Sequence, residues 1–313
     1  MPEVSKSTRL RQLALASLIA NVGLVVTGAA VRLTGSGLGC PTWPRCTDDS
    51  YTTTTAMGIH GAIEFGNRLL TFVLVLIALA CFIAALMEYP RRKSLIVLAL
   101  AGGLGIPGQG VVGGLTVLTN LNPWVVGLHF LLSMTLIALA YALWKRTREG
   151  DRPRRSLVPA PLPALARLTA LVSAAVIVLG VIVTGSGPHA GDEQAKRNNL
   201  DPELVAQAHA DLVFLLIGLS VALWFALRAT KARAAAIRAA GALIVVELAQ
   251  GLIGFVQYFT HLPVVLVAAH MLGACLVWVA TLNVLWNLRE RPTDEALPTP
   301  ATEPAQADLQ LLN

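Results

Sequence analysis

Long apolar runs alternate with short polar segments along the chain. Each of eight runs is long enough to cross a bilayer as a helix, which takes about 20 mostly apolar residues. The runs cover residues 13–33, 58–87, 94–118, 122–144, 167–186, 203–229, 235–259 and 263–287. This pattern predicts an all-α polytopic membrane protein with eight transmembrane helices.

The second run opens with an unusual set of polar side chains. His60, Glu64 and Asn67 are four and then three residues apart, so they share one face of a helix. Ionisable groups are costly inside a membrane and usually serve a function there. These three side chains are therefore the first candidates to face a common buried object.

Composition excludes a soluble domain. Of the 313 residues, 55% are hydrophobic and 13% are charged, and the mean hydropathy is +0.65. The net charge of +6 comes from short basic clusters between the apolar runs, so it indicates membrane topology and not nucleic-acid binding.

The basic clusters predict the orientation. All but five of the 24 lysines and arginines lie at the ends of the runs on the side that holds both termini. The five others are Arg32, Arg45, Arg68, Lys196 and Arg197. Because short loops rich in lysine and arginine stay in the cytoplasm, both termini are predicted to be cytoplasmic.

The chain contains an internal repeat. Residues 109–113 match residues 250–254 and His129 matches His270, both at an offset of 141; at an offset of 142, Asn67 corresponds to His209. The segments 26–28 and 183–185 are also alike. The repeat predicts two pseudo-symmetric four-helix bundles in the same orientation, because four spans preserve sidedness. Within these bundles, Gln109 and Gln250 are expected to link helices and not to act in catalysis.

The predicted organisation follows from the repeat and from a proline-rich, charged segment in the middle of the chain. The N-terminal bundle is expected at 13–146 and the C-terminal bundle at 167–288. Residues 1–12 and the linker 147–166 are expected in the cytoplasm. Residues 289–313, rich in proline, alanine and acids, are expected to form a disordered cytoplasmic tail.

Four histidines lie near the predicted outer ends of inward-running spans. A haem bound by two histidines needs both rings from facing helices at one depth. His209 with His270 is one candidate pair, and His129 with His60 or with residue 67 is the other. A lone histidine at a membrane helix end is more often a hydrogen-bonding group, but the repeat favours ligation of iron by His209, His270 and His129.

Two cysteines share the first outer loop, and one carboxyl group distinguishes the two halves. Cys40 and Cys46 favour a disulfide over a metal site, because no further ligands are nearby. Glu64 has no acidic counterpart, since residue 206 is alanine. It is expected either to pair with Arg68, one turn away, or to act as an electrostatic stabiliser or base.

Several of these segments together resemble haem A synthases. The resemblance rests on residues 26–40, on Trp43, Pro44 and Cys46, on residues 63–68 and on the late histidines, and it extends over nearly the whole chain except the ends and linker. It implies an oxidoreductase in the bacterial plasma membrane that converts the C8 methyl of haem O to a formyl group for cytochrome oxidase assembly.

The resemblance also implies roles for individual residues. The C-terminal bundle would hold haem b on His209 and His270, and the N-terminal bundle would receive haem O near His129 with Glu64 as the catalytic group. Cys40 and Cys46 would form a disulfide that assists electron or haem transfer. Expected partners are haem O, membrane lipid, haem O synthase and cytochrome oxidase assembly factors, and no nucleic acid.

The sequence departs from the family pattern at one ligand position. Many members have Glu-x-x-His-Arg in the second span, whereas this chain has Asn67 where the histidine is expected. Either His60 substitutes, or His129 alone holds the substrate haem and one face of the iron stays open. An alternative function is a non-catalytic membrane cytochrome b that carries electrons between quinone and an outer partner, although this has no need for Glu64 or the cysteine pair.

Overall fold

The computed structural model describes residues 8–292 and contains eight long helices in this range. They are α1 (Thr8–Leu33), α2 (Gly58–Met87), α3 (Lys93–Leu118), α4 (Pro123–Arg146), α5 (Pro161–Ser186), α6 (Pro202–Ala229), α7 (Ala234–Phe259) and α8 (Val264–Asn287). All eight are long and apolar enough to cross a membrane. The predicted all-α polytopic fold is confirmed, while most of the predicted tail lies outside the described residues.

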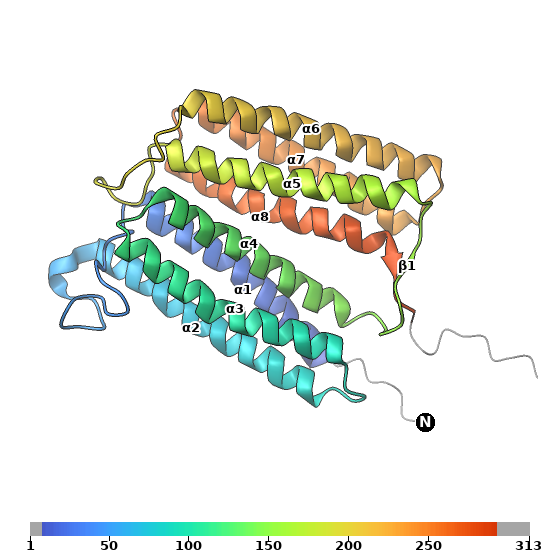
Figure 1. Cartoon of the computed structure of the whole chain (residues 1–313), viewed down its shortest axis with the longest axis horizontal. Coiled ribbons are helices and arrows are strands. Elements are labelled where there is room, and N and C mark those ends of the chain that lie inside the picture. The colour runs from blue at the N-terminus through green and yellow to red at the C-terminus, as the bar shows by residue number, and fades with distance from the viewer. Residues whose placement is uncertain (1–7, 293–313) are drawn as a thin grey trace, which may run out of the picture.

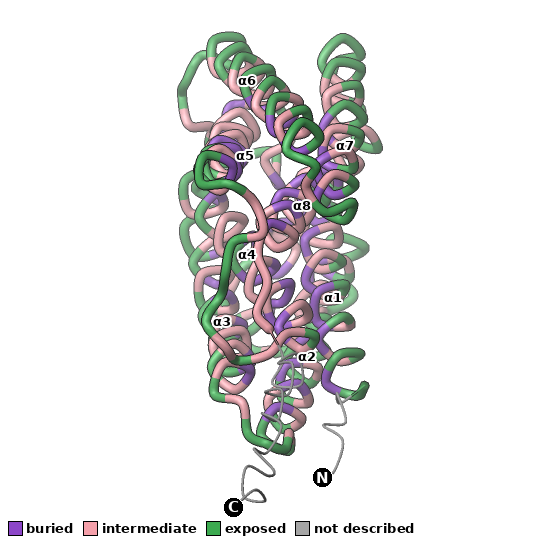
Figure 2. The backbone as a smooth tube through the Cα atoms, turned by 90° about the vertical axis from the view of Figure 1, so that its right-hand side faces the viewer, coloured by how far each residue is buried: buried purple, intermediate pink, exposed green. Residues whose placement is uncertain are grey.

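The helices stand in two parallel rows. One row runs α6, α5, α4, α3 and the other runs α7, α8, α1, α2, with each helix packed against its neighbours in the row and its partner across it. Figure 1 shows α1–α4 on one side of the molecule and α5–α8 on the other, and Figure 2 looks along the helix axes, with the two rows running from top to bottom. The segments that follow α1, α3, α5 and α7 lie at one end of the bundle, which we call the loop end. The opposite end, where α1 begins and α8 ends, is called the terminal end.

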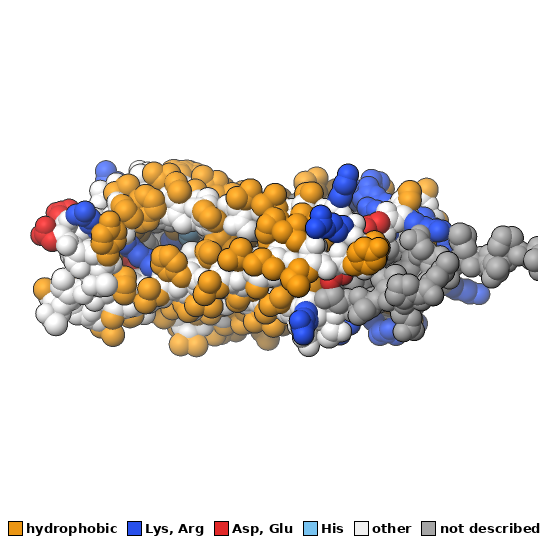
Figure 3. Space-filling view, turned by 90° about the horizontal axis from the view of Figure 1, so that it is seen from below, with side chains coloured by type: hydrophobic (Ala, Val, Ile, Leu, Met, Phe, Trp, Pro, Cys, Tyr) orange, Lys and Arg blue, Asp and Glu red, His pale blue; other side chains and the backbone are white. Residues whose placement is uncertain are grey.

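Apolar side chains cover the long sides of the bundle. Figure 3 shows hydrophobic side chains along the face formed by α2 and α3, with lysines and arginines gathered toward the terminal end. Large apolar residues such as Val265, Phe259 and Phe72 are mostly exposed on the helices. This arrangement is typical of helices that face lipid, because the surrounding solvent is itself apolar.

Two helices begin earlier than the hydrophobic pattern predicts. α1 starts at Thr8 and not at 13, because polar residues with good helix propensity extend the helix beyond its apolar part. α5 starts at Pro161 and not at 167, because proline is tolerated in the first turn, where its missing N–H has no helical partner.

The linker also contains regular secondary structure. Within it, strand β1 (Arg155–Ser156) pairs antiparallel with β2 (Arg289–Glu290) just after α8. Arg155 and Arg233 both form ion pairs with Glu290, and their hydrogen bonds lower the pKa of this carboxyl group. The linker is therefore fastened to the end of α8.

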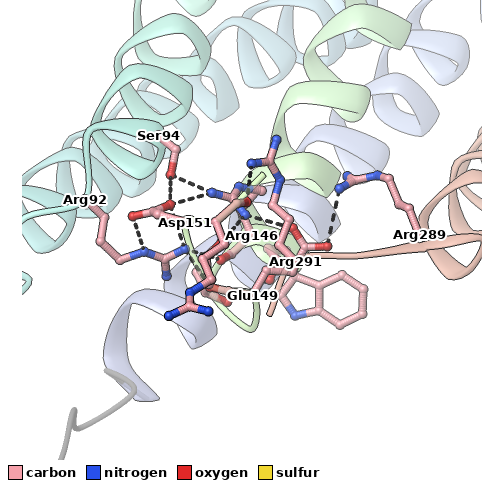
Figure 4. Close-up of polar contacts among 11 residues, drawn as sticks. Arg92, Ser94, Arg146, Glu149, Asp151, Arg289 and Arg291 are labelled. Atoms are coloured by element: carbon pink, nitrogen blue, oxygen red, sulfur yellow. Dashed lines mark hydrogen bonds and ion pairs between the residues drawn. The ribbon is translucent and has the colours of Figure 1, made fainter. Parts of the chain in front are cut away.

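A charged network closes the terminal end between α3, α4 and the linker (Figure 4). Arg146, which is 5% exposed, donates to Glu149 Oε2 at 2.9 Å, to Asp151 Oδ1 at 2.6 Å and to the Ser94 hydroxyl at 2.9 Å. Burial alone would raise the pKa of Asp151, but hydrogen bonds from Arg92 and Ser94 and the charges of Arg92 and Arg146 hold it below its ordinary value. The stabilisation from Asp151 is therefore present at neutral pH and is lost as the pH falls through its lowered pKa.

We expect Arg146→Ala to destabilise the protein. Removing one partner from a buried ion-pair network costs on the order of 3 kcal/mol, because the remaining carboxylates lose their counter-charge. Thermal unfolding in detergent should show a Tm lower by about 5 °C. Arg154→Ala, at an exposed position of the same linker, is the matched control and should leave the Tm unchanged. Equal Tm values for the two variants would contradict this assignment.

Candidate functional site

Three histidines lie at nearly the same depth below the loop end. His129, His209 and His270 come six or seven residues after the first residues of α4, α6 and α8, which all begin at this end. At 1.5 Å per residue the three rings lie about 10 Å into their helices.

Each of the three rings lies against a glycine of a neighbouring helix. A Cβ atom placed on Gly113 of α3 would be 3.1 Å from His129 Cε1, and one on Gly254 of α7 would be 3.2 Å from His270 Cε1. His209 meets Gly180 of α5 in the same way, at 3.2 Å. Any larger residue at these glycines would displace the ring, so the glycines fix where the histidines stand.

The repeated glutamines fix the backbone of two of these histidines. Gln109 Nε2 donates to the His129 carbonyl at 2.7 Å, and Gln250 Nε2 donates to the His270 carbonyl at 2.8 Å. Gln109 also bonds the Ser133 hydroxyl. The predicted role of both glutamines as links between helices is confirmed. The same glutamine-to-carbonyl hydrogen bond occurs twice, 141 residues apart.

The rings of these histidines have nitrogens that no protein group satisfies. The Nδ1 atoms of His129, His209 and His270 are buried and have no hydrogen-bond partner among the described residues, with the Val176 backbone near His209 but outside hydrogen-bonding geometry. The rings are half-buried, and Figure 3 shows the α2/α3 face hollowed near the loop end with histidine atoms inside the hollow. Imidazoles that stand at one depth and are not used for internal hydrogen bonds fit a haem.

His60 and Asn67, the other two predicted ligand positions, are each hydrogen-bonded to another protein side chain. His60 is exposed, and its Nδ1 lies 2.9 Å from the Ser36 hydroxyl in the loop after α1. Asn67 accepts a hydrogen bond from Thr27 Oγ1 of α1, at 2.7 Å from its Oδ1. Both side chains are therefore held by the segment at and after the end of α1.

Glu64 is buried and pairs with Arg68, as one of the two sequence interpretations proposed. The carboxylate is 5% exposed, forms an ion pair with Arg68 and accepts a hydrogen bond from the Cys40 backbone N–H at 2.6 Å. Arg68 in turn donates to the carbonyls of Cys40 and Thr42, at 3.0 and 3.2 Å. One acid and one base on α2 thus hold the loop after α1 onto the helix.

The loop held in this way contains the predicted disulfide. Cys40 and Cys46 are bonded to each other and completely buried, whereas Cys81 and Cys275 are free and buried inside helices. Trp43, between the two bonded cysteines, packs so closely on Gly114 of α3 that a Cβ atom there would overlap the indole. The loop therefore covers the loop end of α2 and α3.

Sequence reasoning missed one buried acid. Glu247 lies in the middle of α7, is 3% exposed and accepts a hydrogen bond from Ser220 of α6 at 2.8 Å, while its Oε2 has no partner among the described residues. It comes one turn before Gln250, which holds His270. The signal was present, because Glu247 is the one acid within the apolar run 235–259.

Comparison with known proteins places the chain in a family. Residues 11–191, more than half of the chain, match the family model of cytochrome oxidase assembly proteins. A haem A synthase of Geobacillus kaustophilus is 32% identical over 131 residues, covering 42% of this chain and 40% of that protein.

Two relatives match over most of their length. A haem A synthase of Azorhizobium caulinodans is 26% identical over 90% of this chain and 95% of its own, and one of Methylobacterium radiotolerans is 27% identical over 84% and 85%. The chain thus spans less than half of the Geobacillus protein and nearly all of the Azorhizobium protein. It belongs to the haem A synthase family of cytochrome oxidase assembly proteins.

Proposed function

We propose that this protein is a haem A synthase, which oxidises the C8 methyl group of haem O to a formyl group. The observation that carries the proposal is the repeated placement of a histidine ring on a glycine, once between α5 and α6, once between α7 and α8 and once between α3 and α4. Two rings in one half suit a resident cofactor, and a single ring in the other suits a substrate that must enter and leave. The two halves correspond to the segments 13–146 and 167–288.

The C-terminal half would hold haem b on His209 and His270. A haem b bound there would supply one-electron transfer. Gly180 and Gly254 set the positions of the two rings, and Gln250 fixes the backbone of His270 from the neighbouring helix. Such outer contacts orient ligands and preserve the spacing that a flat macrocycle needs.

The N-terminal half would receive haem O beside His129. The loop of Cys40 and Cys46 covers this half, and the Glu64 carboxylate lies beneath the loop in a place shielded from solvent. A fixed negative charge in a poorly solvated site favours positive charge that develops on a nearby methyl carbon during oxidation. Arg68 forms an ion pair with the carboxylate and holds it in place.

The reaction balances with dioxygen as the terminal oxidant. Two successive hydroxylations, each taking its oxygen atom from water and releasing two electrons and two protons, convert the methyl to a geminal diol, which loses water to give the aldehyde. The sum is R–CH3 + O2 → R–CHO + H2O, in which carbon loses four electrons and dioxygen gains them. Electrons would pass through the C-terminal half on their way from the substrate.

Conversion of haem O tests this function directly. The full chain is expressed in membranes that make haem O, and the extracted haems are separated and weighed by mass spectrometry. Haem A should accumulate, with a mass gain that matches replacement of two hydrogens by one oxygen. A folded, haem-loaded protein that leaves haem O unchanged in air would refute the proposal and favour the electron-carrying cytochrome.

We also propose that the loop end faces outward and the termini face the cytoplasm, as the basic residues of the terminal end indicate. A membrane-impermeant maleimide should label Asp49→Cys in intact cells, because Asp49 is exposed at the loop end while the four native cysteines are bonded or buried. Arg154→Cys, exposed in the linker, is the matched control and should be labelled only in broken cells. The reverse pattern of labelling would reverse the orientation.

A further inference from the structure

Three histidine–glycine contacts recur in the two halves, and the fourth position expected from the repeat has a glycine but no histidine. Segment 26–28 matches 183–185 at an offset of 157, and the same offset places Gly23 of α1 opposite Gly180 of α5. Gly180 supports the His209 ring, but a Cβ atom on Gly23 would have nothing within 4 Å in the described part of the chain. Gly23 is exposed, so the face of α1 beside Asn67 is open at the position where the other half holds a histidine ring.

The side chain at the position of the missing histidine is an asparagine that bonds α1. Asn67 occupies the position corresponding to His209, and Thr27 Oγ1 donates to its Oδ1 at 2.7 Å. Thr27 comes one turn after Gly23 on the same face of α1, so Gly23 also faces α2. The Asn67 Nδ2 group has no hydrogen-bond partner among residues 8–292.

His60 does not fill the space. It comes seven residues before Asn67 on α2, which places it about 10 Å farther toward the loop end. Its exposed ring contacts Ser36. By contrast, His129 stands on Gly113 as His270 stands on Gly254, at the depth of the other two ring contacts. The N-terminal half therefore offers one imidazole at this level and a gap across from it.

We infer that the N-terminal half leaves one face of its haem iron open to a small exogenous ligand, with Gly23 providing the space and Asn67 lining it. This inference rests on the proposed function, since it takes haem O to bind on His129. Asparagine is a poor iron ligand, and its free Nδ2 is a hydrogen-bond donor suited to a diatomic molecule of the dioxygen class. Gly23 and Asn67 are then the residues that decide which ligands enter.

Carbon monoxide is a suitable probe. The full chain, saturated with added haem O, should show a high-spin ferric signal beside the low-spin signal of the C-terminal half, and the reduced form should bind carbon monoxide at one haem. Asn67→His should convert the high-spin signal to low-spin and abolish carbon monoxide binding, because it completes the second histidine pair.

A second substitution tests the space without adding a ligand. Gly23→Val should weaken carbon monoxide binding by at least about tenfold while the high-spin signal remains, since even one extra methylene alters pocket affinity by that much. Gly218→Val is the matched control: Gly218 also has nothing within 4 Å and comes nine residues after His209, on the opposite face of α6. It should leave binding unchanged.

The results separate this inference from the proposed function. Two low-spin haems in the unaltered protein, or carbon monoxide binding that arises only in His60→Ala, would overturn the open face. Haem A formation is measured on the same preparations. Haem A produced without a ligand-binding haem refutes the inference alone, and a ligand-binding haem without haem A refutes the function alone.

Discussion

Replacing His209 or His270 by alanine is expected to remove the haem of the C-terminal half. Each of the two rings rests on a glycine, and their Nδ1 atoms have no partner among the described residues. Losing one ring removes an iron ligand and leaves an apolar gap against Gly180 or Gly254. Because altering even the outer contacts of a ligand costs 10–100-fold in affinity, loss of the ligand itself should weaken binding by more than about 100-fold.

The measurement is the haem content of purified protein, together with its low-spin signal. Each variant should lose the low-spin signal and one haem per chain while remaining folded, since the rings support no hydrogen bond of the helix bundle. His261→Asn is the matched control, because His261 is exposed in a turn with φ 63°, which asparagine tolerates. A His270→Ala protein with full low-spin haem would show that the pair is structural.

Replacing Glu64 by glutamine is expected to stop haem A formation and to preserve haem binding. Glutamine keeps the size of the side chain and can still accept from the Cys40 N–H, but it removes the negative charge. Loss of a single preorganised electrostatic group in a buried site commonly costs about 100- to 1,000-fold in rate. Haem A formed per haem O bound, measured by mass spectrometry, should fall by at least about 100-fold.

Comparison with alanine separates catalysis from structure. Glu64→Ala removes both the charge and the contact that holds the Cys40 loop, so it should also lower the Tm. Glu203→Gln, in the exposed first turn of α6, is the control for loss of an acid. If Glu64→Gln forms haem A at the normal rate while Glu64→Ala unfolds, then Glu64 serves only to hold the loop.

The hydrophobic pattern by itself determined the eight helices. Six helices begin and end within two residues of the predicted runs, because apolar length is what a bilayer selects. The repeat identified His129, His209 and His270, and the contacts of Gln109 and Gln250 with His129 and His270 recur at the same offset. The disulfide was predictable because just two of the four cysteines share a polar loop.

The tertiary structure alone decided which side chains meet. Sequence periodicity gives the face of a helix but not its rotation and depth against a neighbour, and contacts such as Thr27 with Asn67 or Ser220 with Glu247 depend on both. For the same reason the sequence left Glu64 with two interpretations, and the structure added Cys40 to its partner Arg68. The empty space at Gly23 emerged only from comparing helix contacts, because a missing side chain leaves no pattern in the sequence.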